Sequence, residues 1–167
     1  MARPRSIPDT DIYAAIRALL ARDGEKAVAF GTVARLTGLA APSLVQRYAN
    51  RDGMIRAALL DGWQDLLSRT TTTAESQPQA LLKALAEPAA AMTRPALMAL
   101  TLRDATLRAA AEAWRVQLES LLALRLGGGA RGAESAAMLF AAWQGQLLWL
   151  QAGGKNFRIK EAAKRLT

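Results

Sequence analysis

The chain has 167 residues, and 51% of them are hydrophobic, which is enough for one domain or a small domain joined to a larger one. The absence of cysteine and histidine excludes disulfides, thiolate or imidazole metal sites, and catalysis by either side chain. A net charge of +8 suits a polyanionic partner such as nucleic acid or a membrane surface, although a generally basic protein has the same balance.

The composition favours an all-α fold, because Ala and Leu dominate and β-branched residues are sparse. The first residues carry no apolar run typical of a signal peptide, which fits a cytoplasmic protein. The most apolar stretch, residues 136–150, is interrupted by Gln144, Gly145 and Gln146. It is shorter than the roughly 20 residues of a membrane-spanning helix. We therefore expect a buried or interface helix there and no membrane partner.

Four helices are predicted in the first 70 residues, from apolar side chains spaced three and four apart. Gly38 supplies the permissive backbone of a tight turn after the second helix. Pro42 is tolerated in the first turn of the third. The first predicted helix begins at a cap formed by Asp9 or Thr10 and ends at Gly24. The second runs from Phe30 to Thr37, and the third starts near Ala41. The fourth runs from a cap at Asn50 or Asp52 to about Thr70.

The remaining residues predict further helices separated by clear breaks. Pro88 predicts a kink or an early stop in the fifth helix, and three consecutive glycines, residues 127–129, predict a break. The fifth predicted helix runs from Pro78 to about Met92, and a short sixth helix begins at Pro95. The next two run from a cap at Asp104 to Leu126 and from Ala133 to Ala152. A basic amphipathic segment follows from Ile159 to Leu166.

Residues 29–56 have the features of a helix-turn-helix. A short helix stops at Gly38, a tight turn follows, and a second short helix carries Ser43, Gln46 and Arg47 on its predicted outer side. Such a unit lays its second helix into the major groove of DNA. This stretch therefore proposes double-stranded DNA as the partner.

The order of elements resembles the tetracycline-repressor (TetR) family of transcriptional regulators, most specifically from Asp9 to about Trp63. The resemblance implies a DNA-binding head, residues 1–56, and a helical ligand-binding and dimerisation body, residues 57–167. The matched positions are Val33 and Ala34 for the family's Ile-Ala, Thr37, Gly38 and Leu39 for Ala-Gly-Val, Leu44 for its Leu, Tyr48 for the final aromatic residue, and Arg51 for its Lys.

Four positions depart from the family's pattern. Ala29 stands at a usual Thr and Ala40 at a usual capping Ser, while Val45 replaces a Tyr whose hydroxyl typically contacts phosphate. Arg47 replaces the usual His. Three polar anchoring groups are therefore missing and one positive charge is gained. Phosphate contacts supply much of the affinity for DNA, so this head is expected to bind weakly or to depend on arginine.

The predicted DNA contacts lie at the outer face of the third helix and at the start of the fourth. Gln pairs with adenine and Arg with guanine, so Pro42, Ser43, Gln46 and Arg47 are the predicted readers of base edges. Arg51 is the predicted phosphate contact. We expect Tyr48 to be primarily a core residue, with its hydroxyl reaching solvent or phosphate. Arg3 and Arg5 either form a basic arm on the DNA or take no part.

The resemblance implies an effector pocket and a dimer interface in the body. Met and aromatic side chains suit an adaptable apolar ligand site, although an ordinary hydrophobic core explains the same residue pattern. The predicted pocket residues are Trp63, Leu67, Leu85, Met92, Met98, Leu102 and Trp114. The predicted homodimer interface contains Met138, Trp143, Gln146, Leu147 and Leu150, a set too apolar for one exposed helix.

The sequence thus predicts a DNA-binding regulator, a repressor that releases its operator when a small apolar molecule binds the body. The alternative is a helical binding or adaptor protein with a vestigial head that does not bind DNA. An enzyme is the poorest interpretation, because no carboxylates form a close pair on a predicted cleft; Glu112 and Glu119 share a helix face but are simply explained as solvated. No cofactor and no metal are expected.

Overall fold

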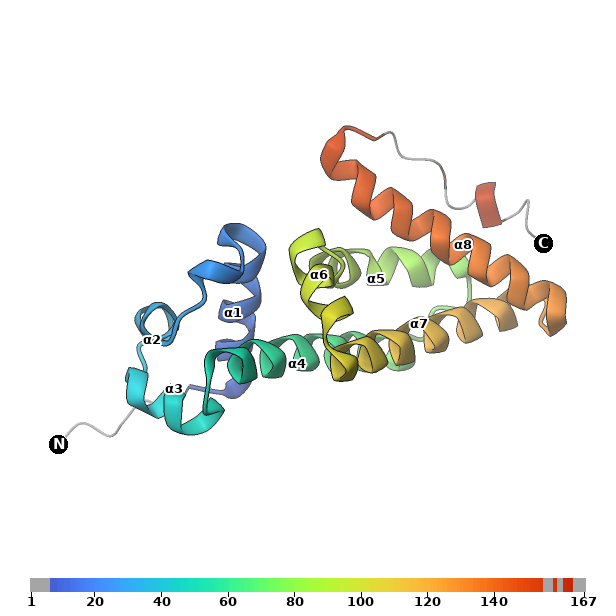
Figure 1. The fold of residues 1–167 in the computed structure, drawn as a ribbon. Helices are drawn as coiled ribbons and strands as arrows, with labels where there is room; N and C mark the ends of the chain where they lie inside the picture. Colours follow the sequence, from blue (N-terminus) through green and yellow to red (C-terminus); the bar gives the residue numbers. More distant parts are fainter. Residues whose placement is uncertain (1–6, 155–157, 159–160, 164–167) are drawn as a thin grey trace. The chain divides into compact units, whose positions relative to one another are not determined.

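The computed structural model describes residues 7–154, 158 and 161–163, and the regular structure of these residues is helical, which confirms the expected all-α class (Figure 1). Arg3 and Arg5, and most of the predicted segment 159–166, lie outside the described residues. The helices are α1 (Asp9–Asp23), η1 (Glu25–Ala27), α2 (Phe30–Thr37), α3 (Ala41–Tyr48), α4 (Arg51–Thr72), α5 (Pro78–Met92), α6 (Pro95–Arg103), α7 (Ala105–Arg125), α8 (Gly129–Trp149) and η2 (Leu150–Ala152), where η marks a 3-10 helix.

Two of the predicted helix caps are confirmed. The Asn50 side-chain oxygen accepts a hydrogen bond from the Gly53 N–H at 2.7 Å at the start of α4. The Asp104 carboxylate accepts hydrogen bonds from the N–H groups of Thr106 and Leu107 at 2.9 and 3.1 Å at the start of α7. Each side chain satisfies backbone donors that have no partner within the helix.

The cap predicted for the first helix is wrong. Helix α1 already includes Asp9, and the residue before it, Pro8, makes no side-chain capping hydrogen bond. Asp9 and Asp11 instead lie in the first turn, where their negative charges interact favourably with the helix dipole. A carboxylate in the first turn and one at the cap give the same local sequence signal, so the sequence alone does not separate them.

The predicted end of the fifth helix is confirmed, and the predicted start of the last long helix is corrected. Helix α5 continues through Pro88 to Met92, so the early stop, one of the two alternatives at Pro88, does not occur. Proline removes the hydrogen bond to the carbonyl four residues earlier, that of Ala84, and because Ala84 is exposed, water can replace the missing donor. Helix α8 begins at Gly129, four residues before the predicted Ala133, directly after Gly127 and Gly128 with their positive φ angles.

The first compact unit comprises residues 1–64 and 95–110, and thus contains the whole predicted head together with α6. Helices α1, α2 and α3 pack in succession, and α6 packs on α1. The Arg17 guanidinium joins α1 to α4 through the Ala58 carbonyl and the Asp61 carboxylate, both at 2.7 Å. The buried apolar side chains are Ile12, Ile16, Leu19, Leu20, Val28, Val33, Leu44, Met54, Ile55, Ala58, Leu59, Trp63, Leu97 and Leu107. A functional boundary at residue 56 stays a prediction.

The second compact unit comprises residues 65–94 and 111–167. Helix α5 packs on α8, and the Trp114 indole N–H donates to the buried Thr70 hydroxyl at 3.1 Å. The Thr70 hydroxyl in turn donates to the Leu66 carbonyl, so this buried polar pair is satisfied. The apolar core contains Leu66, Leu81, Leu82, Leu85, Ala89, Met92, Trp114, Leu118, Leu122, Leu126, Ala136, Leu139, Trp143 and Ala163.

Candidate nucleic-acid interface

The turn between α2 and α3 depends on Gly38. This residue ends α2 in the left-handed conformation, with φ 72° and ψ 12°, and its N–H bonds the Ala34 carbonyl at 2.8 Å. The space around a Cβ at this position is open, so the backbone conformation and not packing requires glycine. The chain then passes through the extended Ala40 into α3.

Neither of the two short helices has a side-chain cap. Ala29 precedes α2 and Ala40 precedes α3, and neither makes a capping hydrogen bond, as expected from these two departures. Such short helices are marginal alone, so their stability comes from packing. Val33 and Leu44 are fully buried and provide that packing.

Helix α3 is held at its end by two tyrosines. The ring centroids of Tyr13 on α1 and Tyr48 on α3 lie 6.1 Å apart in a tilted arrangement. The Tyr48 hydroxyl is buried and lacks a hydrogen-bond partner among the described residues. Burial raises the pKa of Tyr48 to about 12, so this phenol stays neutral at neutral pH. Tyr48 therefore anchors the helix in this structure, and the expectation that its hydroxyl reaches solvent or phosphate is wrong here, because packing against Tyr13 buries the end of the ring.

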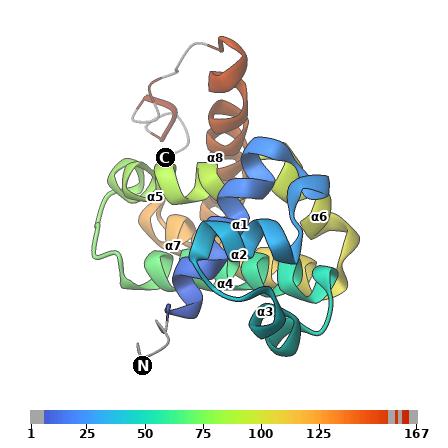
Figure 2. The same cartoon turned by 90° about the vertical axis from the view of Figure 1, so that its left-hand side faces the viewer.

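The outer face of α3 is uncovered, and Figure 2 looks onto α1, α2 and α3 in this unit. Pro42, Ser43 and Gln46, three of the predicted base readers, are exposed on it. Val45 is 44% exposed beside them, although a core position is the simpler expectation for valine. Its apolar surface is consistent with contact to a partner.

Arg47, the fourth predicted base reader, forms an ion pair within the head. Its Nη1 donates to the Asp9 carboxylate of α1, across 38 residues of sequence. Both side chains remain about half exposed, at 42% and 53%. No local pattern predicts this contact, because only the tertiary structure brings Asp9 of α1 next to Arg47 of α3.

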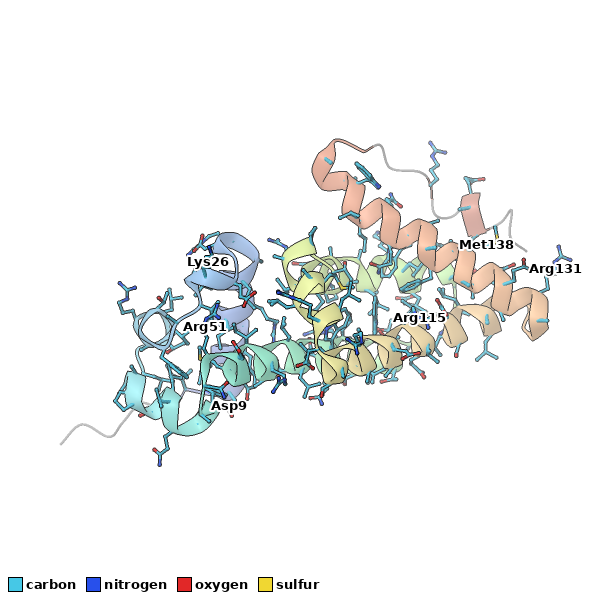
Figure 3. All side chains as sticks on the ribbon, in the orientation of Figure 1. Asp9, Lys26, Arg51, Arg115, Arg131 and Met138 are labelled. Carbon is cyan, nitrogen blue, oxygen red and sulfur yellow. The ribbon has the colours of Figure 1, made fainter. Side chains whose placement is uncertain are left out.

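Arg51, the predicted phosphate contact, also binds groups of its own chain (Figure 3). Its Nε donates to the Val28 carbonyl at 2.6 Å, and its Nη2 donates to the Glu25 carbonyl. Its Nη1 lies 3.5 Å from the Glu25 carboxylate. The guanidinium thus joins the start of α4 to the segment before α2. It does so with a fork of several N–H donors, which the single ammonium of a lysine cannot reproduce.

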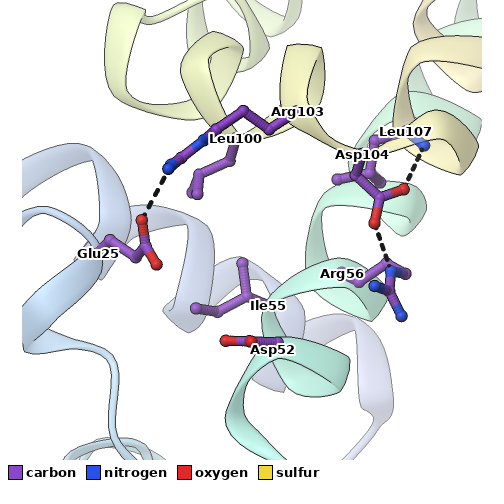
Figure 4. A pocket seen from close by; sticks show the side chains of 8 residues that line it. All are labelled: Glu25, Asp52, Ile55, Arg56, Leu100, Arg103, Asp104 and Leu107. Atoms are coloured by element: carbon purple, nitrogen blue, oxygen red, sulfur yellow. Dashed lines mark hydrogen bonds and ion pairs between the residues drawn. The ribbon is translucent and has the colours of Figure 1, made fainter.

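A pocket of about 250 Å³, lined in part by Glu25, lies in the same unit (Figure 4). Two ion pairs border it: Arg103 to Glu25 at 3.1 Å and Arg56 to Asp104 at 2.6 Å. The Arg56 hydrogen bond, followed by that from the Leu107 N–H, lowers the pKa of Asp104. The pocket is lined by Glu25, Asp52, Ile55, Arg56, Leu100, Arg103, Asp104 and Leu107.

The predicted effector-pocket residues are divided between the two units. Trp63, Met98 and Leu102 belong to the first unit, and Leu67, Leu85, Met92 and Trp114 to the second. Trp63, Leu85, Met92 and Trp114 are buried, and the Trp63 indole donates to the Thr101 hydroxyl at 3.1 Å. Leu102, in contrast, is 59% exposed on α6.

The predicted interface residues do not share one face of α8. Trp143 is buried in the core of its own unit, beside the ring of Phe140. Gln146 and Leu147 are half-buried. Met138 and Leu150 are exposed, and so are two residues that the prediction omitted, Leu148 and Trp149. The exposed apolar surface therefore lies on Met138 and the end of α8.

Two other classes of site receive no support from the described residues. No group of three acidic side chains among them is placed to hold a metal ion. No helix in this part of the chain is long and apolar enough to cross a membrane.

Comparison with known proteins finds similarity in structure only. No protein-family model matches the sequence, and no curated protein matches it. The reduced form of NemR from E. coli matches with a TM-score of 0.67 and 14% identity, over 96% of each chain. A TetR-like transcriptional regulator from Rhodococcus sp. RHA1 matches with a TM-score of 0.59 and 19% identity, over 99% of this chain and 94% of that one.

A TetR-family transcriptional regulator from Streptomyces coelicolor matches with a TM-score of 0.55 and 20% identity, over 94% of each chain. At these sequence identities the similarity concerns the fold alone, and it extends over nearly the full length of the compared chains. The order of the helices and the turn at Gly38 indicate the same fold as these structural matches do. The chain has the TetR-like fold.

Proposed function

We propose that the chain is a DNA-binding transcriptional regulator that reads its operator with α3. The observation that carries this proposal is the exposed face of α3, with Pro42, Ser43 and Gln46 presented on a helix that Gly38 and Leu44 hold in place. The likeness to solved regulators of the TetR-like fold supports it. We propose a cytoplasmic location for it.

The chemistry of α3 suits contact with base edges. A glutamine amide pairs with adenine through two hydrogen bonds, and a serine hydroxyl serves a base or a phosphate. Gln46 and Ser43 lie three residues apart, on the same side of the helix. Arg47 adds a guanidinium next to them that is suited to guanine or phosphate once it leaves Asp9. Arg51 is the proposed backbone contact.

We propose further that the protein is a homodimeric repressor released by a small apolar effector. A dimer matches the two half-sites of an operator, and an effector that favours another spacing of the heads lowers affinity. The buried aromatic, Leu and Met side chains of the second unit, among them Leu85, Met92 and Trp114, are consistent with an apolar site within that unit. The exposed apolar residues of α8 are consistent with a partner subunit.

The alternative is an adaptor protein whose head no longer binds DNA. Two observations favour it: α2 and α3 lack capping hydroxyls, and the guanidiniums of Arg47 and Arg51 already have acceptors in their own chain. Binding to duplex DNA separates the two functions directly.

The test is the fluorescence anisotropy of a labelled random duplex, titrated with the protein from low to high salt. A regulator binds at low salt and weakens steeply as salt rises, by about 0.9 in log K per log salt for each phosphate contacted. Selection from randomised oligonucleotides then yields the operator. Absence of binding to any duplex at low salt favours the adaptor function.

On the selected operator, Gln46→Ala is expected to reduce discrimination at one base pair by about 1–3 kcal/mol. The matched control is Gln64→Ala, which removes the same amide from an exposed position of α4. Equal affinities and base preferences for the two variants contradict a reading role for Gln46.

A further inference from the structure

We propose that Asp9 holds Arg47 as a latent DNA contact and thereby sets the affinity of the head for DNA. In the free protein the Arg47 guanidinium binds the Asp9 carboxylate, and on DNA it exchanges that carboxylate for a phosphate or a guanine. The inference rests on the proposed DNA binding by α3. It assigns a role to a residue of α1 that does not belong to the helix-turn-helix itself.

The contact is fixed by the packing around it. Asp9 lies in the first turn of α1, and Tyr13 lies one turn later on the same helix. Tyr13 packs on Tyr48, the neighbour of Arg47 at the end of α3. The first turn of α1 and the last turn of α3 are therefore held together, and the carboxylate is presented to the guanidinium.

The same contact leaves Arg47 available for exchange. Its side chain is 42% exposed and that of Asp9 is 53% exposed, so the ion pair is solvated and breaks easily. Gln46, the neighbour of Arg47, is exposed on the proposed reading face. A phosphate or guanine that approaches this face can thus compete with Asp9 for the guanidinium.

Asp9 opposes DNA binding through its pair with Arg47. While the pair is intact, Asp9 neutralises Arg47, which is the one positively charged residue of α3. Removal of this charge should therefore raise the affinity for DNA, provided that Arg47 is present.

Two substitutions that change the net charge equally test this role. Asp9→Asn removes the partner of Arg47, whereas Asp11→Asn removes an exposed carboxylate from the same turn, one that forms no ion pair among the described residues. Each is made in the wild-type chain and in an Arg47→Gln background. Affinity for a duplex of fixed sequence is measured by anisotropy at several salt concentrations.

Asp9→Asn is expected to raise affinity severalfold more than Asp11→Asn, because Arg47 then no longer has to leave Asp9 before it binds DNA. In the Arg47→Gln background the two substitutions should have equal effects. Without DNA, the NMR signals of the Arg47 guanidinium should shift in Asp9→Asn and stay in place in Asp11→Asn.

Three results overturn the inference. Equal effects of the two substitutions in the wild-type chain show that only general charge matters. A loss of affinity in Asp9→Asn shows that Arg47 needs Asp9 in order to be positioned for DNA. If neither the wild type nor any variant binds duplex DNA at low salt, the proposed function fails as well, and this outcome is distinct from the first two, in which the wild type binds.

Discussion

The guanidinium of Arg51 is occupied by acceptors of its own chain. It donates to the carbonyls of Val28 and Glu25 and lies beside the Glu25 carboxylate. These contacts span 23 and 26 residues of sequence and join the start of α4 to the segment before α2. At the residue scale, this arginine therefore positions the head, whatever it adds as a phosphate contact.

Arg51→Lys is expected to destabilise the protein by about 1 kcal/mol, because the ammonium cannot bond both carbonyls with the geometry of the fork. Urea unfolding measures the loss, and Arg35→Lys, at an exposed position of α2, is the control. If Arg51 served as a phosphate contact alone, Lys would keep the stability of the wild type and most of its DNA affinity.

At the scale of elements, the chain relies on packing for α3, the proposed DNA-reading helix, and on caps for two of its longer helices. Helices α2 and α3 have eight residues each and no side-chain cap, so Val33 and Leu44 must hold them through burial. Helices α4 and α7 begin with the caps Asn50 and Asp104. Helices α2 and α3 therefore depend on their neighbours more than the capped helices do.

Asp104→Ala is expected to destabilise the protein by about 1 kcal/mol at neutral pH, through the loss of the cap. Since the folded state lowers the pKa of Asp104, its ionised form stabilises the fold above the unfolded pKa, which is about 3.9. That part of the contribution disappears as pH falls through the lower folded pKa. The difference between wild type and Asp104→Ala in urea unfolding should shrink accordingly.

Asp104→Asn is the control for this experiment, since asparagine also caps a helix but does not titrate. It should recover most of the stability at neutral pH and differ from Asp104→Ala by the same amount at every pH. Equal losses in the Asn and Ala variants at neutral pH would indicate that the Arg56 pair, and not the cap, is the important contact.

At the scale of the whole molecule, the exposed apolar residues of α8 form the proposed dimer interface. Met138, Leu148 and Trp149 are 55%, 47% and 63% exposed on a helix whose opposite side carries the buried Leu139 and Trp143. Met138 and Trp149 are 11 residues apart, about three helical turns, and so lie on a common stripe. An apolar stripe of this kind is best explained by a second subunit.

Met138→Glu and Trp149→Glu are each expected to weaken the proposed dimer at least tenfold, because a carboxylate is costly to bury in an apolar interface. Sedimentation velocity over a range of concentrations measures the dissociation constant. The control is Leu124→Glu, at a position 73% exposed on α7 of the same unit. Equal dissociation constants for all three variants would place the interface elsewhere.

Sequence alone determined where most helices lie, because caps, proline and glycine act within a few residues. Gly38 and Asp104 are identified from their immediate neighbours, while the sequence leaves the cap of α4 open between Asn50 and Asp52. The sequence also determines the turn before α3. It placed Pro42, Ser43 and Gln46 on an outer face, since the burial of Leu44 sets the orientation of so short a helix.

Only the tertiary structure decided which groups the charged side chains contact and which apolar side chains are buried. Asp9 and Arg47 are 38 residues apart, and no local pattern predicts which carboxylate a guanidinium will meet. On α8, Trp143 lies in the core while Trp149 is exposed, although both are apolar residues of one helix. Helical periodicity gives the angle between side chains, but only packing against α5 and the rest of its unit decides which side of α8 is buried.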